Sequence, residues 1–253
     1  MTDVRLSSDW VRTLSEVCSG YQRVLVLLSA GGRERGPLEA AERALADVET
    51  TVLPPAPVTP SVEKLVDLFG HMDLQAFNAV IAIGGGSVID SAKALIMARN
   101  CTSAADFEMC LINGSLLSDA YDFDVVAVPT TAGTGSEVTP FATVWDTKNM
   151  RKSSISGDSL QPRYAVLDPS LLKSLEGDSL LFPALDAVSH AIESLWSRSA
   201  TPQSRRSAAT ALSLLSQAVG TCVTPLPDFE RLSLGSLYAG LAIAQSRTAI
   251  AHS

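Results

Sequence analysis

The sequence Ile83-Gly84-Gly85-Gly86-Ser87-Val88-Ile89-Asp90-Ser91-Ala92-Lys93-Ala94 joins the end of an apolar run to a helical pattern. Glycines let the backbone approach an anion closely, and the first N–H groups of a helix point towards it. The stretch is not the G-x-G-x-x-G fingerprint, and three glycines alone are explained equally well by a tight turn. In this setting it predicts a strand, a turn suited to a pyrophosphate, and a helix.

The surrounding sequence has the rhythm of a parallel sheet. Apolar runs rich in Val and Ile occupy residues 24–28, 79–83 and 125–128, and helical patterns near 37–48 and 60–70 flank a short strand near 50–53. Strand patterns cease near residue 180, where Ala-, Leu- and Ser-rich helical patterns begin. We expect an α/β protein with a Rossmann-like dinucleotide-binding domain over residues 1–170 and an all-helical metal-binding domain over residues 171–253.

Composition excludes several classes of protein. Of the 253 residues, 46% are hydrophobic and 18% charged, which is typical of an ordered chain, and the net charge of −8 argues against a nucleic-acid surface. Four scattered cysteines predict reduced thiols and a cytoplasmic location. We expect no secretion signal at the start, and no membrane span, because the uncharged residues 207–227 are rich in Ser and Thr.

A second candidate loop follows the run at 125–128. It reads Pro129-Thr130-Thr131-Ala132-Gly133-Thr134-Gly135-Ser136-Glu137. The hydroxyls of Thr130, Thr131 and Thr134 can donate to and accept from a ribose, a phosphate or an amide. The alternative is a turn that satisfies only its own backbone.

Histidine is the scarcest candidate ligand, with three in the chain. Asp186 and His190 are four residues apart in a helical pattern and would share one face, and His252 adds a distant imidazole. A carboxylate and two imidazoles are suited to a divalent cation. The set also matches the two-His-one-carboxylate site of an oxygenase, which we rank lower.

These motifs together resemble the iron-containing (group III) alcohol dehydrogenases. The resemblance rests on the order and spacing of four motifs: Gly84-Gly85-Gly86-Ser87 with Asp90 and Lys93, residues 129–137, Asp168-Pro169, and Asp186-Ala187-x-x-His190-Ala191-x-Glu193. It runs from near residue 20 to the last residue. Residues 139–146, 193–197 and 247–253 are most similar to the phosphonoacetaldehyde reductase, or hydroxyethylphosphonate dehydrogenase, branch. Glycerol dehydrogenases and dehydroquinate-synthase-like cyclases, which share the fold, rank last.

The resemblance implies a cofactor site and a metal site. The cofactor, NAD or NADP, would contact Gly84, Gly85, Gly86, Ser87 and Asp90 around its pyrophosphate, Thr130, Thr131 and Thr134 around its nicotinamide half, and Lys152. The alternative for Lys152 is a solvated charge on a hairpin. Asp186, His190 and His252 match three of four metal ligands, with Fe2+ expected and Zn2+ the alternative.

The implied reaction is hydride transfer between NAD(P) and a small alcohol or aldehyde, such as 2-hydroxyethylphosphonate or phosphonoacetaldehyde. Ser29 stands where many members have an Asp, and Arg33 and Arg35 follow it, which would permit NADP. A homodimer is left open.

The chain also departs from the family. A fourth ligand beyond His252 and roughly the last third of a typical member have no counterpart, so we expect a truncated member, with cofactor binding but impaired catalysis as the alternative. Pro183, just before the metal motif, would be tolerated if the helix begins there, because the first turn does not use its missing N–H. We also expect an exposed apolar patch that includes Leu212, Leu215, Leu237 and Leu241.

Overall fold

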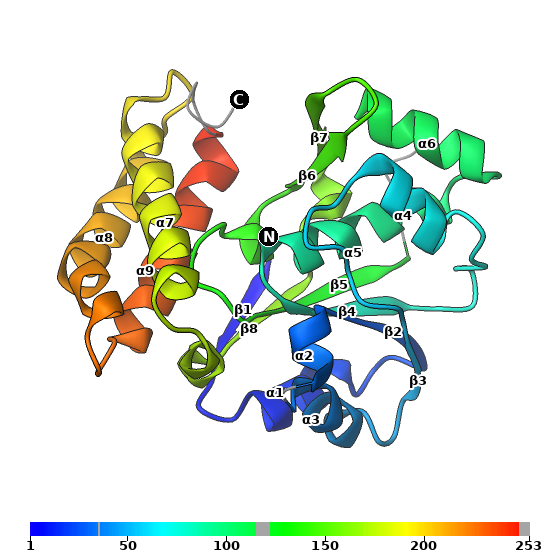
Figure 1. Ribbon diagram of the computed structural model, residues 1–253, viewed down its shortest axis with the longest axis horizontal. Helices are drawn as coiled ribbons and strands as arrows, with labels where there is room; N and C mark the ends of the chain where they lie inside the picture. The colour runs from blue at the N-terminus through cyan, green and yellow to red at the C-terminus, as the bar shows by residue number, and fades with distance from the viewer. Residues whose placement is uncertain (35, 115–121, 248–253) are drawn as a thin grey trace.

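The computed structural model describes residues 1–34, 36–114 and 122–247. An α/β part is followed by a group of long helices, α7, α8 and α9, which lie together on one side (Figure 1). The strands are β1 (Asp3–Leu6), β2 (Arg23–Leu28), β3 (Glu49–Val52), β4 (Ala79–Gly84), β5 (Asp124–Pro129), β6 (Phe141–Asp146), β7 (Arg151–Ser156) and β8 (Tyr164–Leu167). The helices are α1 (Trp10–Cys18), α2 (Ala30–Glu34), α3 (Pro37–Ala44), α4 (Val62–Phe69), α5 (Gly86–Arg99), α6 (Ala104–Asn113), α7 (Asp178–Trp196), α8 (Pro202–Ala218) and α9 (Phe229–Ser246), with the 3-10 turns η1 (Ser136–Val138), η2 (Asp158–Leu160), η3 (Pro169–Ser174) and η4 (Val219–Val223).

The main sheet has the strand order β1-β8-β5-β4-β2-β3, and all its pairings are parallel. From β2 the chain moves outward to β3 and returns to β4 on the other side of β2. The place where the connections change direction, between β2 and β4, is the switch point of the sheet. Ligands of such sheets bind there, beyond the carboxyl ends of the strands. The predicted Rossmann-like sheet is therefore confirmed, and its switch point coincides with the glycine turn that follows β4.

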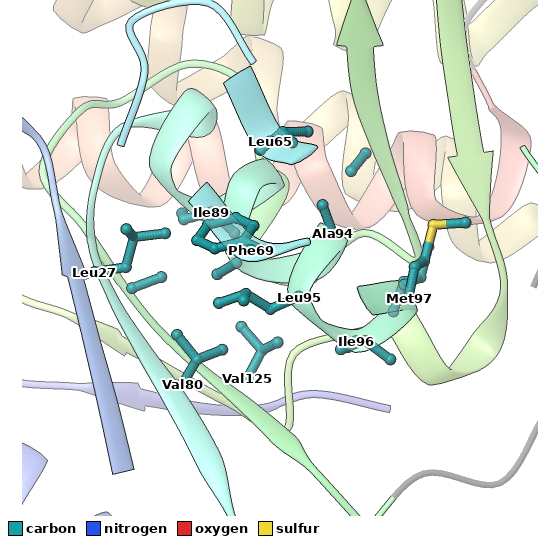
Figure 2. Close-up of a cluster of buried hydrophobic side chains, with 14 of the residues drawn as sticks. Leu27, Leu65, Phe69, Val80, Ile89, Ala94, Leu95, Ile96, Met97 and Val125 are labelled. Atoms are coloured by element: carbon teal, nitrogen blue, oxygen red, sulfur yellow. The ribbon is translucent and has the colours of Figure 1, made fainter. Parts of the chain in front are cut away.

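Helices cover both faces of the sheet. Alternate residues of β4 point to opposite sides: Val80 packs in one core with α4 and α5, and Ile81 packs in the other with α1 and α3. Figure 2 shows the first core, where Leu65 and Phe69 of α4 lie over the sheet beside Leu95 of α5. Burial on both faces explains why the strand runs are apolar without alternation.

The helical part has an alanine-rich core. Ala184, Ala187 and Ala191 of α7 face Ala211 of α8 and Ala239 of α9, and small side chains let the three helices approach closely. Among the described residues, no helix has the length and apolar composition that crossing a bilayer requires.

The predicted apolar patch is placed wrongly. Leu215 is fully buried because α7, α8 and α9 pack on one another over it, and Leu237 is nearly so because it packs against Val138 of η1 and against Ala165 and Leu167 of β8. The large exposed apolar side chains of the helical part are instead Phe182, Leu185, Trp196, Val223 and Leu226. Three of them lie along one helix, α7.

Pro183 does not stand in the first turn of its helix. Helix α7 begins at Asp178, so Pro183 lies inside it, beyond the first turn. A Cβ on Gly133 would lie 2.7 Å from Pro183 Cβ, so the ring packs against the loop after β5. Pro183 thus contributes a rigid contact between the helical part and that loop.

Candidate active site

The cavity that unites the predicted motifs has a volume of about 290 Å³. One wall is the start of α5, a second is the loop after β5 with the hairpin β6–β7, and a third is formed by α7 and α9. Its lining residues are Pro60, Gly86, Ser87, Asp90, Thr134, Ser136, Thr139, Phe141, Thr143, Trp145, Lys152, Asp186, His190 and Ile243. Residues predicted to bind a cofactor and residues predicted to bind a metal therefore face the same space.

The glycine turn forms the entrance to helix α5. The amino-terminal cap is Gly85, in extended conformation and without a side-chain hydrogen bond to the helix. A Cβ on Gly86 would lie 2.6 Å from the Thr134 side chain, so only glycine lets this loop lie against the turn. The first N–H groups of a long helix face an anion well at such a terminus.

The loop after β5 is held by close backbone contacts. Gly135 has φ +65°, and a Cβ there would lie 2.3 Å from the Cα of Gly240 in α9. A Cβ on Gly85 would lie 3.0 Å from Thr131 Oγ1. This loop, residues 130–136, therefore lies between the glycine turn and the helical part.

A second cavity, of about 200 Å³, lies at the neighbouring strand ends. Ser29, at the end of β2, and Thr130, at the end of β5, line it together with Gly31 and Gly32. Ile83 lines this cavity and Gly86 lines the first, so both open at the carboxyl end of β4. Seven of the predicted cofactor residues thus line one or other of two adjacent cavities, whereas Gly84, Gly85 and Thr131 line neither.

Arg33 is engaged elsewhere in the fold. Its guanidinium donates to the carbonyl oxygen of Leu53, after β3. Arg35, the second arginine of the NADP hypothesis, lies outside the described residues.

Two of the three predicted metal ligands come together. His190 Nε2 lies 3.7 Å from Asp186 Oδ1, one turn apart on α7, and both line the first cavity. The His190 side chain is 8% exposed and that of Asp186 34%. His252 lies outside the described residues, within which no cluster of three His, Cys, Asp or Glu forms. A carboxylate and an imidazole on one face suit a divalent cation.

Asp90 lines the cavity but also has partners within the protein. Its carboxylate accepts hydrogen bonds from the Ser136 hydroxyl and, at 2.9 Å, from the Thr143 N–H. Burial raises the pKa of Asp90, and the nearby charge of Lys93 opposes that rise. Its predicted role as a cofactor contact stays a prediction.

Sequence reasoning missed the hairpin wall. Phe141, Thr143 and Trp145 alternate with buried residues along β6 and line the cavity, and Lys152 of β7 pairs with Trp145. The period-two pattern of β6 was the available signal. Lys152 is exposed and also lines the cavity, and its predicted contact with the cofactor stays a prediction.

Comparisons with known proteins decide the family. The family model described as iron-containing alcohol dehydrogenase matches residues 2–169, and the model for the carboxyl-terminal part of the same family matches residues 182–253. The chain belongs to the iron-containing alcohol dehydrogenase family. The predicted resemblance is therefore confirmed.

Two relatives illustrate the likeness of this chain to other members of the family. Phosphonoacetaldehyde reductase of Streptomyces viridochromogenes is 37% identical over 209 residues, 80% of this chain and 52% of that protein. An NAD-dependent methanol dehydrogenase of Bacillus methanolicus is 28% identical over 92% of this chain and 62% of its own length. The chain thus spans between half and two thirds of these relatives.

Solved structures agree. An iron-containing alcohol dehydrogenase of Thermotoga maritima has a TM-score of 0.88 at 27% identity, over 99% of this chain and 69% of that one. Sulfoacetaldehyde reductase of Bifidobacterium kashiwanohense, solved in complex with NAD+, has a TM-score of 0.88 at 25% identity, over 99% of this chain and 67% of that one.

Proposed function

We propose that this chain carries the cofactor site and part of the metal site of an NAD(P)-dependent oxidoreductase that interconverts a small alcohol and its aldehyde. The observation that carries the proposal is the shared cavity: Gly86 and Ser87 line it from one side, and Asp186 and His190 from the other. Hydride transfer needs a cofactor and a polarised substrate oxygen within one enclosed space.

The residues present fit a dinucleotide. The turn at Gly86 leaves no room for a Cβ beside Thr134, and it opens a helix of 14 residues. Backbone N–H groups at such a terminus bind a pyrophosphate. The two cavities on either side of the β4 terminus would take the two halves of the cofactor, one against Ser29 and the other against Thr134.

The donor set fits a divalent cation. Asp186 supplies a carboxylate and His190 an imidazole, with His252 as the third proposed ligand; Fe2+ is expected from the family and Zn2+ is the alternative. When bound, the cation would act as a Lewis acid on the substrate oxygen, and the nicotinamide would supply the hydride. The chain's own contribution is to hold both groups and to exclude water with Phe141, Trp145 and Ile243.

The finer substrate proposal is phosphonoacetaldehyde, reduced to 2-hydroxyethylphosphonate. It is supported by the likeness to phosphonoacetaldehyde reductase and by the small volume, about 290 Å³, of the cavity that Asp186 and His190 line. A sulfoacetaldehyde reductase among the structural neighbours acts, by name, on a comparable anionic aldehyde.

The cofactor choice is open to either nicotinamide dinucleotide. Ser29 carries no charge to repel a 2′-phosphate, which favours tolerance of NADP. Arg33 donates to Leu53 and is therefore a weaker candidate for that phosphate than the sequence suggests.

The test uses the chain loaded anaerobically with Fe2+. NADH and NADPH are titrated separately, and aldehyde-dependent oxidation of each is followed with phosphonoacetaldehyde and with acetaldehyde. We expect saturable cofactor binding and a higher kcat/KM for the phosphonate. Binding without turnover favours the catalytically impaired alternative, and no binding of either cofactor overturns the proposal.

A further inference from the structure

Lys93 is a fully buried lysine on α5, two turns after the glycine turn. Its Nζ donates to Ser136 Oγ at 3.0 Å, to the Thr139 carbonyl at 2.9 Å and to the Phe141 carbonyl at 2.7 Å. A buried ammonium group is tolerated only when it is paired and hydrogen-bonded in this way. The lysine therefore joins α5 to a chain segment more than 40 residues away.

Asp90 lies one turn earlier on the same face of α5, with Oδ1 4.0 Å from Lys93 Nζ. It accepts a hydrogen bond from the Ser136 hydroxyl and another from the Thr143 N–H. The acceptor Asp90 and the donor Lys93 thus lie one turn apart on the same face of α5. Together the two side chains hold both the loop after β5 and the first half of β6.

The residues that this pair holds are those that line the candidate active site. Ser136, Thr139, Phe141 and Thr143 all face the cavity opposite the glycine turn. The turn itself, Gly86 and Ser87, is the amino-terminal end of the helix that carries the pair. The pair therefore fixes the position of the loop and hairpin relative to the turn.

Stability alone does not explain a charged pair here. Replacing a buried ion pair by apolar residues is often neutral or stabilising. Burial lowers the pKa of Lys93 to about 8, although Asp90 and Glu137 oppose that fall, so the charged form is disfavoured by its surroundings. What the charge supplies is geometry, because the ammonium group donates to several acceptors at once.

We propose that Asp90 and Lys93 are positioning residues that set the separation between the glycine turn and the β6 wall and thereby control nicotinamide dinucleotide binding. The inference rests on the proposed function. The residues that would surround the cofactor belong to α5, to β6 and to the loop that follows β5. The Asp90–Lys93 pair connects these three elements by direct hydrogen bonds.

The proposal has a pH signature of its own. The charged groups that face the pair are Glu137 on η1 and, through Asp90, Lys152 on β7. As the pH rises through about 8, Lys93 loses its proton and cofactor affinity falls. Its effect on folding has the opposite sign: the folded pKa lies below the unfolded 10.5, so the penalty for burying the charge fades as the pH rises from 8 to 10.5.

The experiment measures NADH binding by fluorescence from pH 6.5 to 9.5 for the wild type, Lys93→Met, Lys93→Arg and the exposed control Lys64→Met. We expect Lys93→Met to raise the Kd at least tenfold at pH 7 and to remove the rise above pH 8. Lys93→Arg should keep the charge and restore much of the affinity, and Lys64→Met should behave as the wild type. A packing role alone predicts no such pH profile and no rescue by arginine.

The outcomes separate this inference from the proposed function. If the wild type binds NADH and Lys93→Met has the same Kd and the same pH profile, the positioning role is overturned and the proposed function is not. Failure of the wild type to bind NADH or NADPH overturns both proposals. If Lys93→Met does not fold, Asp90→Asn takes its place, with the same tenfold rise expected, and amide exchange at Thr143 reports whether the wall has detached. Unchanged affinity in a folded Asp90→Asn protein contradicts the inference.

Discussion

Gly135 and Gly240 meet at a distance that excludes a side chain on either residue. A Cβ on Gly135 would lie 2.3 Å from the Gly240 Cα, and a Cβ on Gly240 would lie 2.7 Å from the Gly135 Cα. The loop after β5 crosses α9 at this point. The crossing joins the α/β part to the helices and so holds the third wall of the cavity.

Substitution at this crossing should destabilise the protein. Gly135→Ala adds a strained φ to a steric clash, each costing roughly 1–3 kcal/mol. Gly240→Ala should show the clash alone. Urea unfolding measures both, with Gly20→Ala as the control, because a Cβ there meets open space. Equal stability of the Gly135 and Gly20 variants would show that the loop does not pack as described.

The glycine turn should be needed for the cofactor more than for the fold. A Cβ on Gly86 would lie 2.6 Å from the Thr134 side chain, which lines the cavity and would have to move. We expect Gly86→Ala to raise the NADH Kd at least tenfold and to lower the thermal midpoint less than Gly135→Ala does, because its clash is with a side chain and not with backbone. Fluorescence titration and calorimetry check the two quantities, and unchanged NADH binding would remove the turn from the cofactor site.

The metal pair should be separable from cofactor binding. Asp186→Asn and His190→Gln keep the size of the side chain and remove a carboxylate or an imidazole ligand. We expect each to weaken Zn2+ or Fe2+ binding at least tenfold by calorimetry and to leave the NADH Kd within about twofold, because the ligands face the cavity from another helix. Full metal affinity in both variants would argue against this site.

Lys152 and Lys148, both in the β6–β7 hairpin, allow a test of a cavity lysine against a surface lysine. Lys152 lines the cavity, whereas Lys148 forms an ion pair with Glu108 at 2.8 Å on the surface. Lys152→Ala should weaken NADH binding roughly tenfold, the size of one charge-assisted contact. Lys148→Ala should leave it unchanged. A similar effect of both substitutions would point to net charge rather than to contact.

The exposed apolar side chains of α7 should promote association between copies of the chain. Phe182 is 60% exposed and Trp196 68%, and both lie along one helix with Leu185. Replacing Phe182 and Trp196 by serine should lower the concentration-dependent light scattering of the chain without loss of helical circular dichroism. Light scattering that the double substitution leaves unchanged would show that the chain associates through another surface.

The strands of the sheet centre could be predicted because both of their faces are buried. β2, β4 and β5 are continuous apolar runs for that reason. β1 was missed, since it is a four-residue edge strand with exposed side chains. Local sequence carries little signal for a strand whose pairing depends on β8, about 160 residues away.

The site was predictable where one motif supplies neighbouring atoms. Asp186 and His190 lie on one face because of helical periodicity, and the glycine turn follows from its place between β4 and α5. The role of Lys93 could not be predicted, because its hydrogen-bond partners, two backbone carbonyls and the hydroxyls of Ser136 and Thr139, are brought near only by the fold. The same holds for Trp145 and Pro60, whose contact at 2.8 Å joins distant segments.

We propose that one cavity holds the nicotinamide and the metal together. The most direct test is proton NMR of NAD+ bound to the chain, with Mn2+ as a paramagnetic probe at Asp186 and His190. We expect selective broadening of the nicotinamide protons over the adenine protons, and its loss in the Asp186→Asn, His190→Gln double variant. Equal broadening of both rings, or none while NAD+ and Mn2+ are both bound, would contradict it.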